Sequence, residues 1–180
     1  MNINDLSRHL SDIDILRRKQ LSIGARTSEK LVSLDGIDKF INLEHLEIFK
    51  ISSLKDISAL KKLKCLEKLS LTHCRNINNI DIISDIPSLR SLIIEKCGII
   101  EIPNLDNLGN LRLIKVGNNN ISELPIFKEN GLIVGVYGNP IVYSIPRVNY
   151  SFNTPNMVKG LNNCTKNYLR DKKIKNILND

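Results

Sequence analysis

The 180-residue chain has no tryptophan, four phenylalanines, four tyrosines and only two alanines. Since alanine is the best helix former, its scarcity argues against a tightly packed helical bundle. The apolar residues are mostly aliphatic instead, with 27 isoleucines and 25 leucines. A chain of this length is about one domain, and its 42% hydrophobic content is enough for a sizeable core.

Long apolar stretches are also missing. No window approaches the roughly 18 uncharged apolar residues of a membrane helix, and charged residues from position 5 onward interrupt the place where a signal peptide would have its apolar segment. We therefore expect a soluble, cytoplasmic protein. Its four cysteines should then be reduced thiols, and no C-x-x-C pair points to zinc or redox chemistry.

The excess of positive charge lies at the C-terminus. Of the net charge of +7, residues 142–180 carry +5 and residues 1–141 only +2. This distribution argues against nucleic-acid binding by the whole surface. It leaves open a basic C-terminal helix that contacts nucleic acid or an anionic surface through Lys166, Arg170, Lys172, Lys173 and Lys175.

An internal repeat organises the rest of the chain. Residues 66–74 and 89–97 both read L-x-x-L-x-L-x-x-C, and related segments begin at residues 43 and 111, so that successive copies are 23, 23 and 22 residues apart. A weaker copy begins at Gly131, and Leu21 and Ile23 fit the strand of a degenerate first unit. Between these motifs, an apolar residue recurs at every third position.

This pattern resembles the leucine-rich repeat family, whose unit is L-x-x-L-x-L-x-x-N/C-x-L over 20 to 29 residues. The spacing is similar to the short class of about 22 residues, found in internalins and in a regulatory subunit of protein phosphatase. The chain departs from the pattern at Ile51, where asparagine or cysteine is expected, at an inserted residue before Ile77, and at Gly131.

The predicted fold is an α/β solenoid, curved and right-handed, with a parallel sheet on its concave side and 3₁₀ or extended segments on its convex side. Alternating apolar residues make each motif a strand with one buried face. Asn119 and Asn139 are suited to bind backbone groups where the chain bends inward, and Cys74 and Cys97 would fill the same place. Leu69, Leu92 and Ile114 should stack on one another.

Both ends of an open solenoid need covers. We expect a helical N-terminal cap in residues 1–19, the repeats in residues 20–145, and a C-terminal capping segment with a basic helix in residues 146–180. The cap helix is predicted over residues 4–18, with Asn4 or Asp5 as its N-cap. The residues that recur at helical spacing are Leu6, Leu10, Ile13 and Leu16 or Arg17.

The predicted binding surface is the concave face, formed by the strand residues that point away from the core. We expect a protein partner to contact it. The exposed apolar or aromatic groups predicted there are Phe49, Ile93, Leu113, Ile133 and Tyr137. The predicted partner-binding residues are His45, Glu47, Phe49, Lys68, Ser70, Thr72, Ile93, Glu95, Leu113, Lys115 and Tyr137.

No residue pattern points to catalysis. His45 and His73 lack a second ligand at helical or turn spacing, and the repeat register turns Cys74 into the core, away from His73. Phosphate-binding, dinucleotide-binding and metalloprotease motifs are absent from the sequence. We therefore expect no enzyme activity, no metal and no cofactor.

Two functions remain as hypotheses. The first is a non-catalytic, monomeric binding module in a regulatory, inhibitory (immunity-like) or effector role, as the resemblance implies. The second is nucleic-acid or anionic-surface binding through the basic C-terminal residues.

Overall fold

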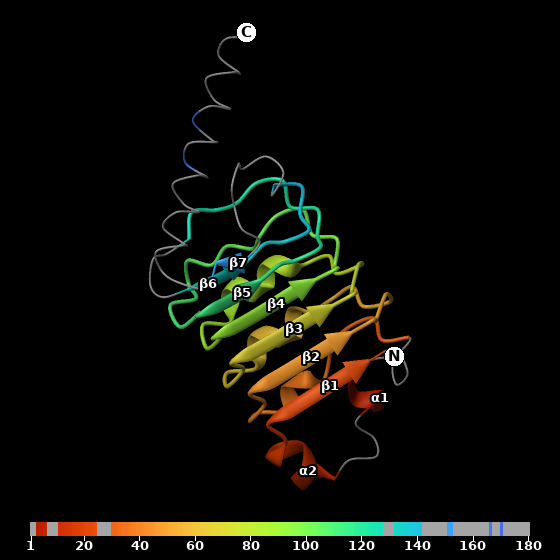
Figure 1. Ribbon diagram of the computed structural model, residues 1–180. Helices are drawn as coiled ribbons and strands as arrows, with labels where there is room; N and C mark the ends of the chain where they lie inside the picture. The colour runs from red at the N-terminus through yellow and green to blue at the C-terminus, as the bar shows by residue number, and fades with distance from the viewer. Residues whose placement is uncertain are drawn as a thin grey trace.

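The computed structural model describes residues 3–6, 11–24, 30–127, 132–141 and 151–152, together with Lys166 and Arg170. In this part of the chain, the strands form one sheet in which spatial order follows sequence order (Figure 1). The first six strands run parallel. They are β1 (Gln20–Gly24), β2 (His45–Phe49), β3 (Lys68–Thr72), β4 (Ser91–Glu95), β5 (Leu113–Lys115) and β6 (Ile133–Gly135).

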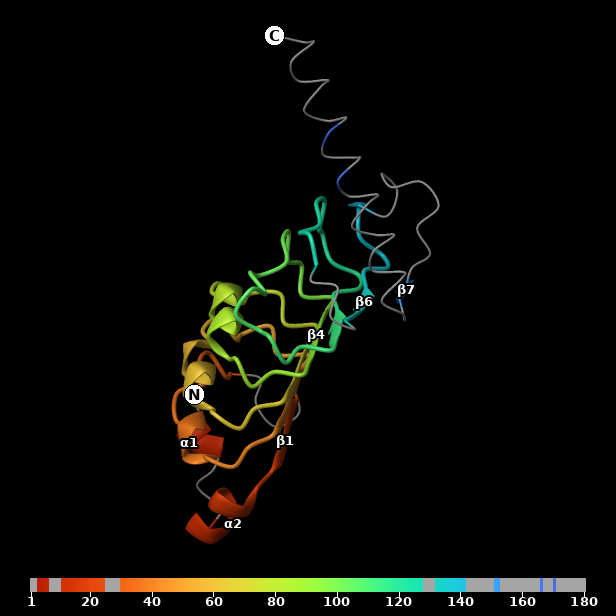
Figure 2. The same cartoon turned by 90° about the vertical axis from the view of Figure 1, so that its left-hand side faces the viewer.

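The return segments lie behind this sheet. Three of them contain short 3₁₀ helices, which Figure 2 shows on the side opposite the strands: η2 (Ile37–Lys39), η3 (Ser58–Lys62) and η4 (Ile80–Asp85). The next return, residues 99–111, has no regular helix, although Ile102, Leu108 and Leu111 still point into the core. Since i and i+3 side chains eclipse in a 3₁₀ turn, an apolar residue at every third position buries one side of each return.

Pairing between strands keeps equivalent repeat positions side by side. Leu69 of β3 is the register partner of Leu92 in β4, which in turn partners Ile114 in β5. All three are buried. The predicted stacking is confirmed, and with it the leucine-rich repeat solenoid. The weak first unit is confirmed as well, because β1 pairs with β2 along its whole length.

Polar and sulfur-containing side chains line the bend that follows the strands. The Asn119 carbonyl oxygen accepts hydrogen bonds from the backbone N–H groups of Cys97 and Gly98, both at 2.9 Å, while its amide donates to the Ile94 and Val116 carbonyls. One repeat later, the Asn139 amide makes the equivalent donations to the Val116 and Val136 carbonyls, and its carbonyl oxygen accepts a 3.1 Å hydrogen bond from the Ile121 N–H. Both side chains are buried. As predicted, asparagine satisfies the backbone groups at the bend.

The preceding repeats use thiols at the same place. Cys97 Sγ lies 3.4 Å from the Leu71 carbonyl oxygen, and Cys74 Sγ lies 3.5 Å from that of Thr72. Both cysteines are buried, and the equivalent position of the β2 repeat is the fully buried Ile51. A small or apolar group is therefore accepted at this place in the first half of the solenoid.

The N-terminal prediction was right about helices and wrong about their arrangement. Two short helices are present, α1 (Ile3–Leu6) and α2 (Asp12–Arg17). Ser11 is the N-cap of α2, since its Oγ accepts a hydrogen bond from the Asp14 N–H at 3.1 Å. A helix therefore begins at residue 12, which is near the middle of the single helix predicted over residues 4–18.

The apolar face of this N-terminal region also differs from the prediction. Ile13 and Leu16 are 60% and 44% exposed, whereas Ile3 and Ile15 are buried. Ile3 is held by a backbone hydrogen bond to the Asp35 carbonyl, which places α1 against the first return. Leu10 and the side chain of Leu6 lie outside the described residues. The predicted stripe failed because it assumed one continuous helix.

At the other end, one strand runs against the rest. β7 (Ser151–Phe152) pairs antiparallel with β6, with Val134 opposite Phe152. The edge of β6 is thereby covered by the segment that we expected to close the solenoid. The basic helix predicted near the C-terminus lies outside the described residues, apart from Lys166 and Arg170, which are helical and exposed.

The amide at position 119 should contribute strongly to stability. Asn119→Ala removes the hydrogen-bond acceptor of the buried Cys97 N–H and of the partly buried Gly98 N–H, and a buried donor left without a partner costs about 1 to 3 kcal/mol. We expect the free energy of unfolding to fall by about 2 to 4 kcal/mol in urea denaturation. Asn120→Ala is the matched control, because that neighbouring side chain is exposed. Equal stability of the two variants would contradict this role.

Candidate functional site

The concave face consists of three rows of side chains that cross the strands. The register aligns His45, Lys68, Ser91, Leu113 and Ile133 in the first row and Glu47, Ser70, Ile93, Lys115 and Gly135 in the second. The third row contains Phe49, Thr72 and Glu95 and continues past the strand ends with Gly117 and Tyr137. The eleven predicted partner-binding residues therefore share one face. That they bind a partner stays a prediction.

The chemical character of this face changes along the solenoid. Over β1 to β4 it is hollowed into an open groove of about 530 Å³. Polar groups dominate there, and the Ser22 hydroxyl donates a 3.0 Å hydrogen bond to Glu47. Toward the C-terminal strands, the half-buried Ile93, Leu113 and Ile133 make the face more apolar. A partner that spans the face would therefore contact polar groups over the N-terminal strands and aliphatic groups over the C-terminal strands.

Phe49 and Tyr137 each cover a glycine. The Phe49 ring lies over Gly24 in β1, at the place that a side chain on that glycine would occupy, and the Tyr137 ring lies over Gly117 in the same way. Large rings can lie flat across the third row because these two neighbours lack a Cβ. Phe49 remains 38% exposed, whereas Tyr137 is half-buried.

The Tyr137 side chain is less accessible to a binding partner than we predicted. Its hydroxyl donates a 2.7 Å hydrogen bond to Glu95 Oε1, which lies two repeats away. This bond to the carboxylate, assisted by burial, raises the pKa of Tyr137 to about 12. The side chain thus ties β4 to the end of the solenoid, and this tie is a structural role that the sequence pattern did not reveal.

The turns after the strands share an unusual backbone conformation. Lys50, His73, Lys96 and Asn118 have φ values between +54° and +57°, and Gly138 has +66°. Each residue directly precedes the core position occupied by Ile51, Cys74, Cys97, Asn119 or Asn139. Sequence reasoning considered His73 only as a catalytic or metal-binding candidate and did not single out this turn position. The signal that could have found these residues is their fixed place in every repeat.

The two histidines considered above differ in their surroundings. His45 is half-buried in the first row of the concave face, and the Cys74 sulfur beside His73 points into the core, as predicted. Burial raises the pKa of Cys74 and raises that of Cys97 to about 11, so both are thiols at neutral pH. Cys65, Cys74 and Cys97 form no disulfide, and Cys164 lies outside the described residues.

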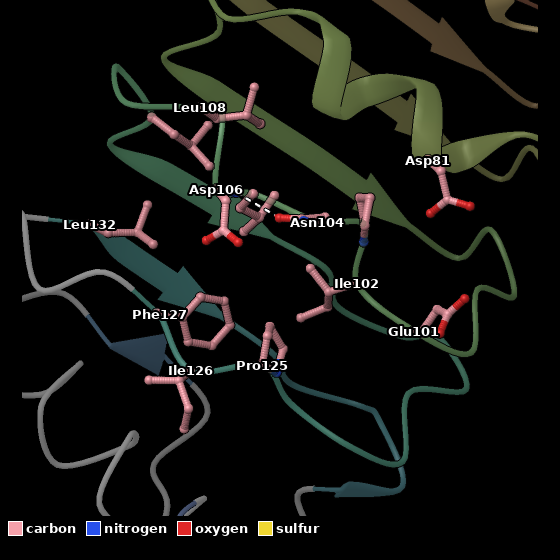
Figure 3. A pocket seen from close by; sticks show the side chains of 13 residues that line it. Asp81, Glu101, Ile102, Asn104, Asp106, Leu108, Pro125, Ile126, Phe127 and Leu132 are labelled. Carbon is pink, nitrogen blue, oxygen red and sulfur yellow. Dashed lines mark hydrogen bonds between the residues drawn. The ribbon is translucent and has the colours of Figure 1, made fainter.

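A second cleft, of about 500 Å³, opens on the return side of the last repeats (Figure 3). Its apolar wall contains Ile102, Leu108, Pro125 and Phe127, and carboxylates lie around it at Asp81, Glu101 and Asp106. Phe127 and Leu132 both line it, and residues 128–131 between them lie outside the described part of the chain. No pattern in the sequence indicated this cleft.

Two kinds of feature are missing from the described residues. Nowhere in this part of the chain do three or more histidine, cysteine, aspartate or glutamate side chains gather as a metal site would require. In the same residues, no helix is both long and apolar enough to span a bilayer.

The parallel strands, the eclipsed returns and the buried asparagines define a leucine-rich repeat protein. More narrowly, the chain belongs to the family described as R13L1/DRL21 LRRs, whose model matches residues 6–97. Proteins of the leucine-rich repeat class generally act as protein-interaction modules and are typically non-catalytic. The repeats beyond residue 97 continue the same pattern in the structure.

Similar solved structures include a leucine-rich repeat protein of Leptospira interrogans, with 16% sequence identity and a TM-score of 0.46. The match covers 71% of this chain, which spans 39% of the length of that protein. The comparison with curated proteins found no match.

The Tyr137 hydrogen bond makes a testable electrostatic prediction. Glu95→Gln replaces the accepting carboxylate with a neutral amide, so the pKa of Tyr137 should fall from about 12 toward its ordinary value near 10. An alkaline titration followed by NMR at the tyrosine Cζ carbon measures this shift. The exposed Glu101→Gln is the control and should leave the Tyr137 pKa in place.

The same bond has a defined pH range of action. Because the folded pKa of Tyr137 is raised, its stabilising effect should be complete below pH 10 or so and disappear as the pH rises through about 12. Tyr137→Phe should therefore lower the free energy of unfolding at neutral pH and have a smaller effect near pH 12. An equal loss at both pH values would show that the bond to Glu95 does not account for the destabilisation.

Proposed function

We propose that the chain is a non-catalytic module that holds a folded protein partner against its concave face. The observation that carries this proposal is the alignment of three outward-facing rows on successive paired strands. Such rows present charged, polar and aliphatic groups together over a broad surface. A regulatory, inhibitory (immunity-like) or effector role is compatible with this mode of binding.

Rigidity supports the same proposal. The strands are held by continuous pairing, and the bend behind them is held by side-chain amides of Asn119 and Asn139. A surface that is already ordered loses little conformational entropy on docking, which leaves more of the contact energy for affinity. Phe49 supplies an exposed aromatic group of the kind that is often important in protein interfaces.

The wider proposal concerns the organisation of the chain. We divide it into an N-terminal cap in residues 1–19, repeats in residues 20–145 and a C-terminal capping segment with a basic helix in residues 146–180. As part of the same proposal, the protein acts as a monomer in the cytoplasm. Light scattering of the purified protein and fractionation of the native cell test these two statements.

Binding through the basic C-terminal residues has less support. Lys166 and Arg170 are exposed, but Lys172, Lys173 and Lys175 lie outside the described residues. The helical alignment that this hypothesis requires is therefore carried by the sequence pattern alone. It stays a prediction about the tail and is separate from the concave face.

A single bulky substitution tests the concave face. Ser70 lies in the middle row on β3 and lines the groove, so Ser70→Arg should obstruct docking while leaving the core untouched. We expect this variant to lose a protein that co-purifies with the unmodified chain from the native cell, with affinity reduced on the order of tenfold or more. Ser52→Arg, at an exposed loop position, is the matched control.

Circular dichroism and urea denaturation should show that both arginine variants remain folded. Retention of the partner by Ser70→Arg, or its equal loss from both variants, would exclude the concave face as the binding surface.

A further inference from the structure

Three successive repeats place a bulky side chain in a strained backbone conformation. Lys50, His73 and Lys96 have φ values of 57°, 57° and 55°. Left-handed backbone is unfavourable for an ordinary L residue, whereas glycine and asparagine adopt it easily. In the next two repeats, the same position is occupied by residues of these two favourable types, Asn118 and Gly138. Backbone strain alone therefore does not explain why the first three have basic side chains.

These basic residues lie on adjacent rungs. The Lys50 N–H donates to the Thr72 carbonyl at 2.8 Å, and the His73 N–H donates to the Glu95 carbonyl at 3.0 Å. The Lys96 N–H continues the series with the Gly117 carbonyl at 3.3 Å. Neighbouring strands are about 4.8 Å apart, so the three side chains start from closely spaced points. They follow directly after the third row of the concave face.

Arg75 adds a fourth basic group beside His73. We call Lys50, His73, Arg75 and Lys96 the basic ridge. Both lysines and the arginine are exposed, and His73 is half-buried. The ion pairs found among the described residues join other groups: Lys19 with Glu44, Lys62 with Asp38, and Arg90 with Glu67. The ridge cations thus have no carboxylate partner in the described part of the chain.

The charges around His73 show that the local field at the ridge is positive. Its pKa is lowered by burial first and then by Lys96, Lys50 and Arg75, while Glu95 alone acts in the opposite direction. The Glu95 carboxylate is also engaged by the Tyr137 hydroxyl. A charged group that approaches the ridge from solvent therefore meets a positive local field, although residues 1–141 carry only +2.

We propose that the basic ridge receives an acidic helical segment of the protein that docks on the concave face. This inference rests on the proposed function and specifies the chemistry of the partner. Glutamates three or four residues apart on a helix are about 5 to 6 Å from one another, close to the spacing of the rungs. Such a helix can bring one carboxylate to each successive ridge cation.

A nucleic acid fits this surface less well. Its phosphates would pass the carboxylates of Glu47 and Glu95 in the rows beside the ridge, and the small net charge of residues 1–141 provides little general attraction. A protein helix can instead place apolar or neutral groups over those rows. The acidic protein segment is therefore the partner class that the charges favour.

The test uses the full chain and a defined probe. The probe is a fluorescent, alanine-rich helical peptide with glutamate at every fourth position, and its counterpart has glutamine at those positions. The ridge variant Lys50→Gln/Arg75→Gln/Lys96→Gln removes three charges. Its matched control is Lys39→Gln/Lys55→Gln/Lys61→Gln, which removes three exposed charges elsewhere. Fluorescence anisotropy at low salt measures binding.

We expect the glutamate peptide to bind the unmodified chain and the control. It should bind the ridge variant about tenfold more weakly, since each exposed ion pair is weak but three are removed together. The proposal is overturned if the glutamine peptide binds equally well or if the control loses as much affinity. It is also overturned if single-stranded DNA of equal charge binds the ridge more tightly. Loss of a cellular partner in Ser70→Arg is a separate readout, so either hypothesis can fail alone.

Binding at the ridge should also depend on pH. Carboxylates that approach His73 favour its protonated form, so the complex should take up a proton and strengthen as the pH falls from about 7.5 to 5.5. The charged groups acting on this imidazole are Lys96, Lys50 and Arg75, which oppose its protonation, and Glu95, which favours it. His73→Gln should remove the pH dependence. An unchanged pH profile in that variant would exclude His73 from the contact.

Discussion

The structure depends on the burial of stacked aliphatic side chains. A single repeat of this chain exposes an apolar face that it cannot cover, and Leu69, Leu92 and Ile114 become buried only because three strands align in register. Parallel pairing with a side-chain period of two permits no slip of one residue, since a slip would turn every leucine outward. The same constraint that forms the core therefore places the remaining side chains of each strand on the opposite face.

The bend behind the strands connects the core with the surface. Asn119 satisfies the backbone of the neighbouring repeat, and the residue before it turns the chain through the left-handed conformation. In two earlier repeats, the buried position is occupied by Cys74 and Cys97, and the turn residues that precede them are His73 and Lys96. One local geometry thus buries one side chain and exposes its predecessor at every rung, which is how the basic ridge arises from a structural repeat.

Regular features could be predicted and singular ones could not. The strand positions, their register and the roles of Asn119 and Cys97 recur every 20 to 23 residues, so several copies support each statement. The N-terminal helices occur once, and the spacing of Ile13 and Leu16 predicted the wrong buried face because Ser11 starts a new helix. The contact of Tyr137 with Glu95 joins different repeats, and no local pattern indicates such a pair.

The amino-acid sequence by itself determined the repeat, its period and the inward or outward direction of each strand side chain, because periodic burial is a property of spacing along the chain. Only the tertiary structure decided which outward groups remain accessible. Tyr137 is restrained by Glu95, whereas Lys50, His73 and Lys96 line one edge of the concave face. The physical reason is that accessibility and local charge depend on neighbours one or two repeats away, which only the stacking of the strands brings together.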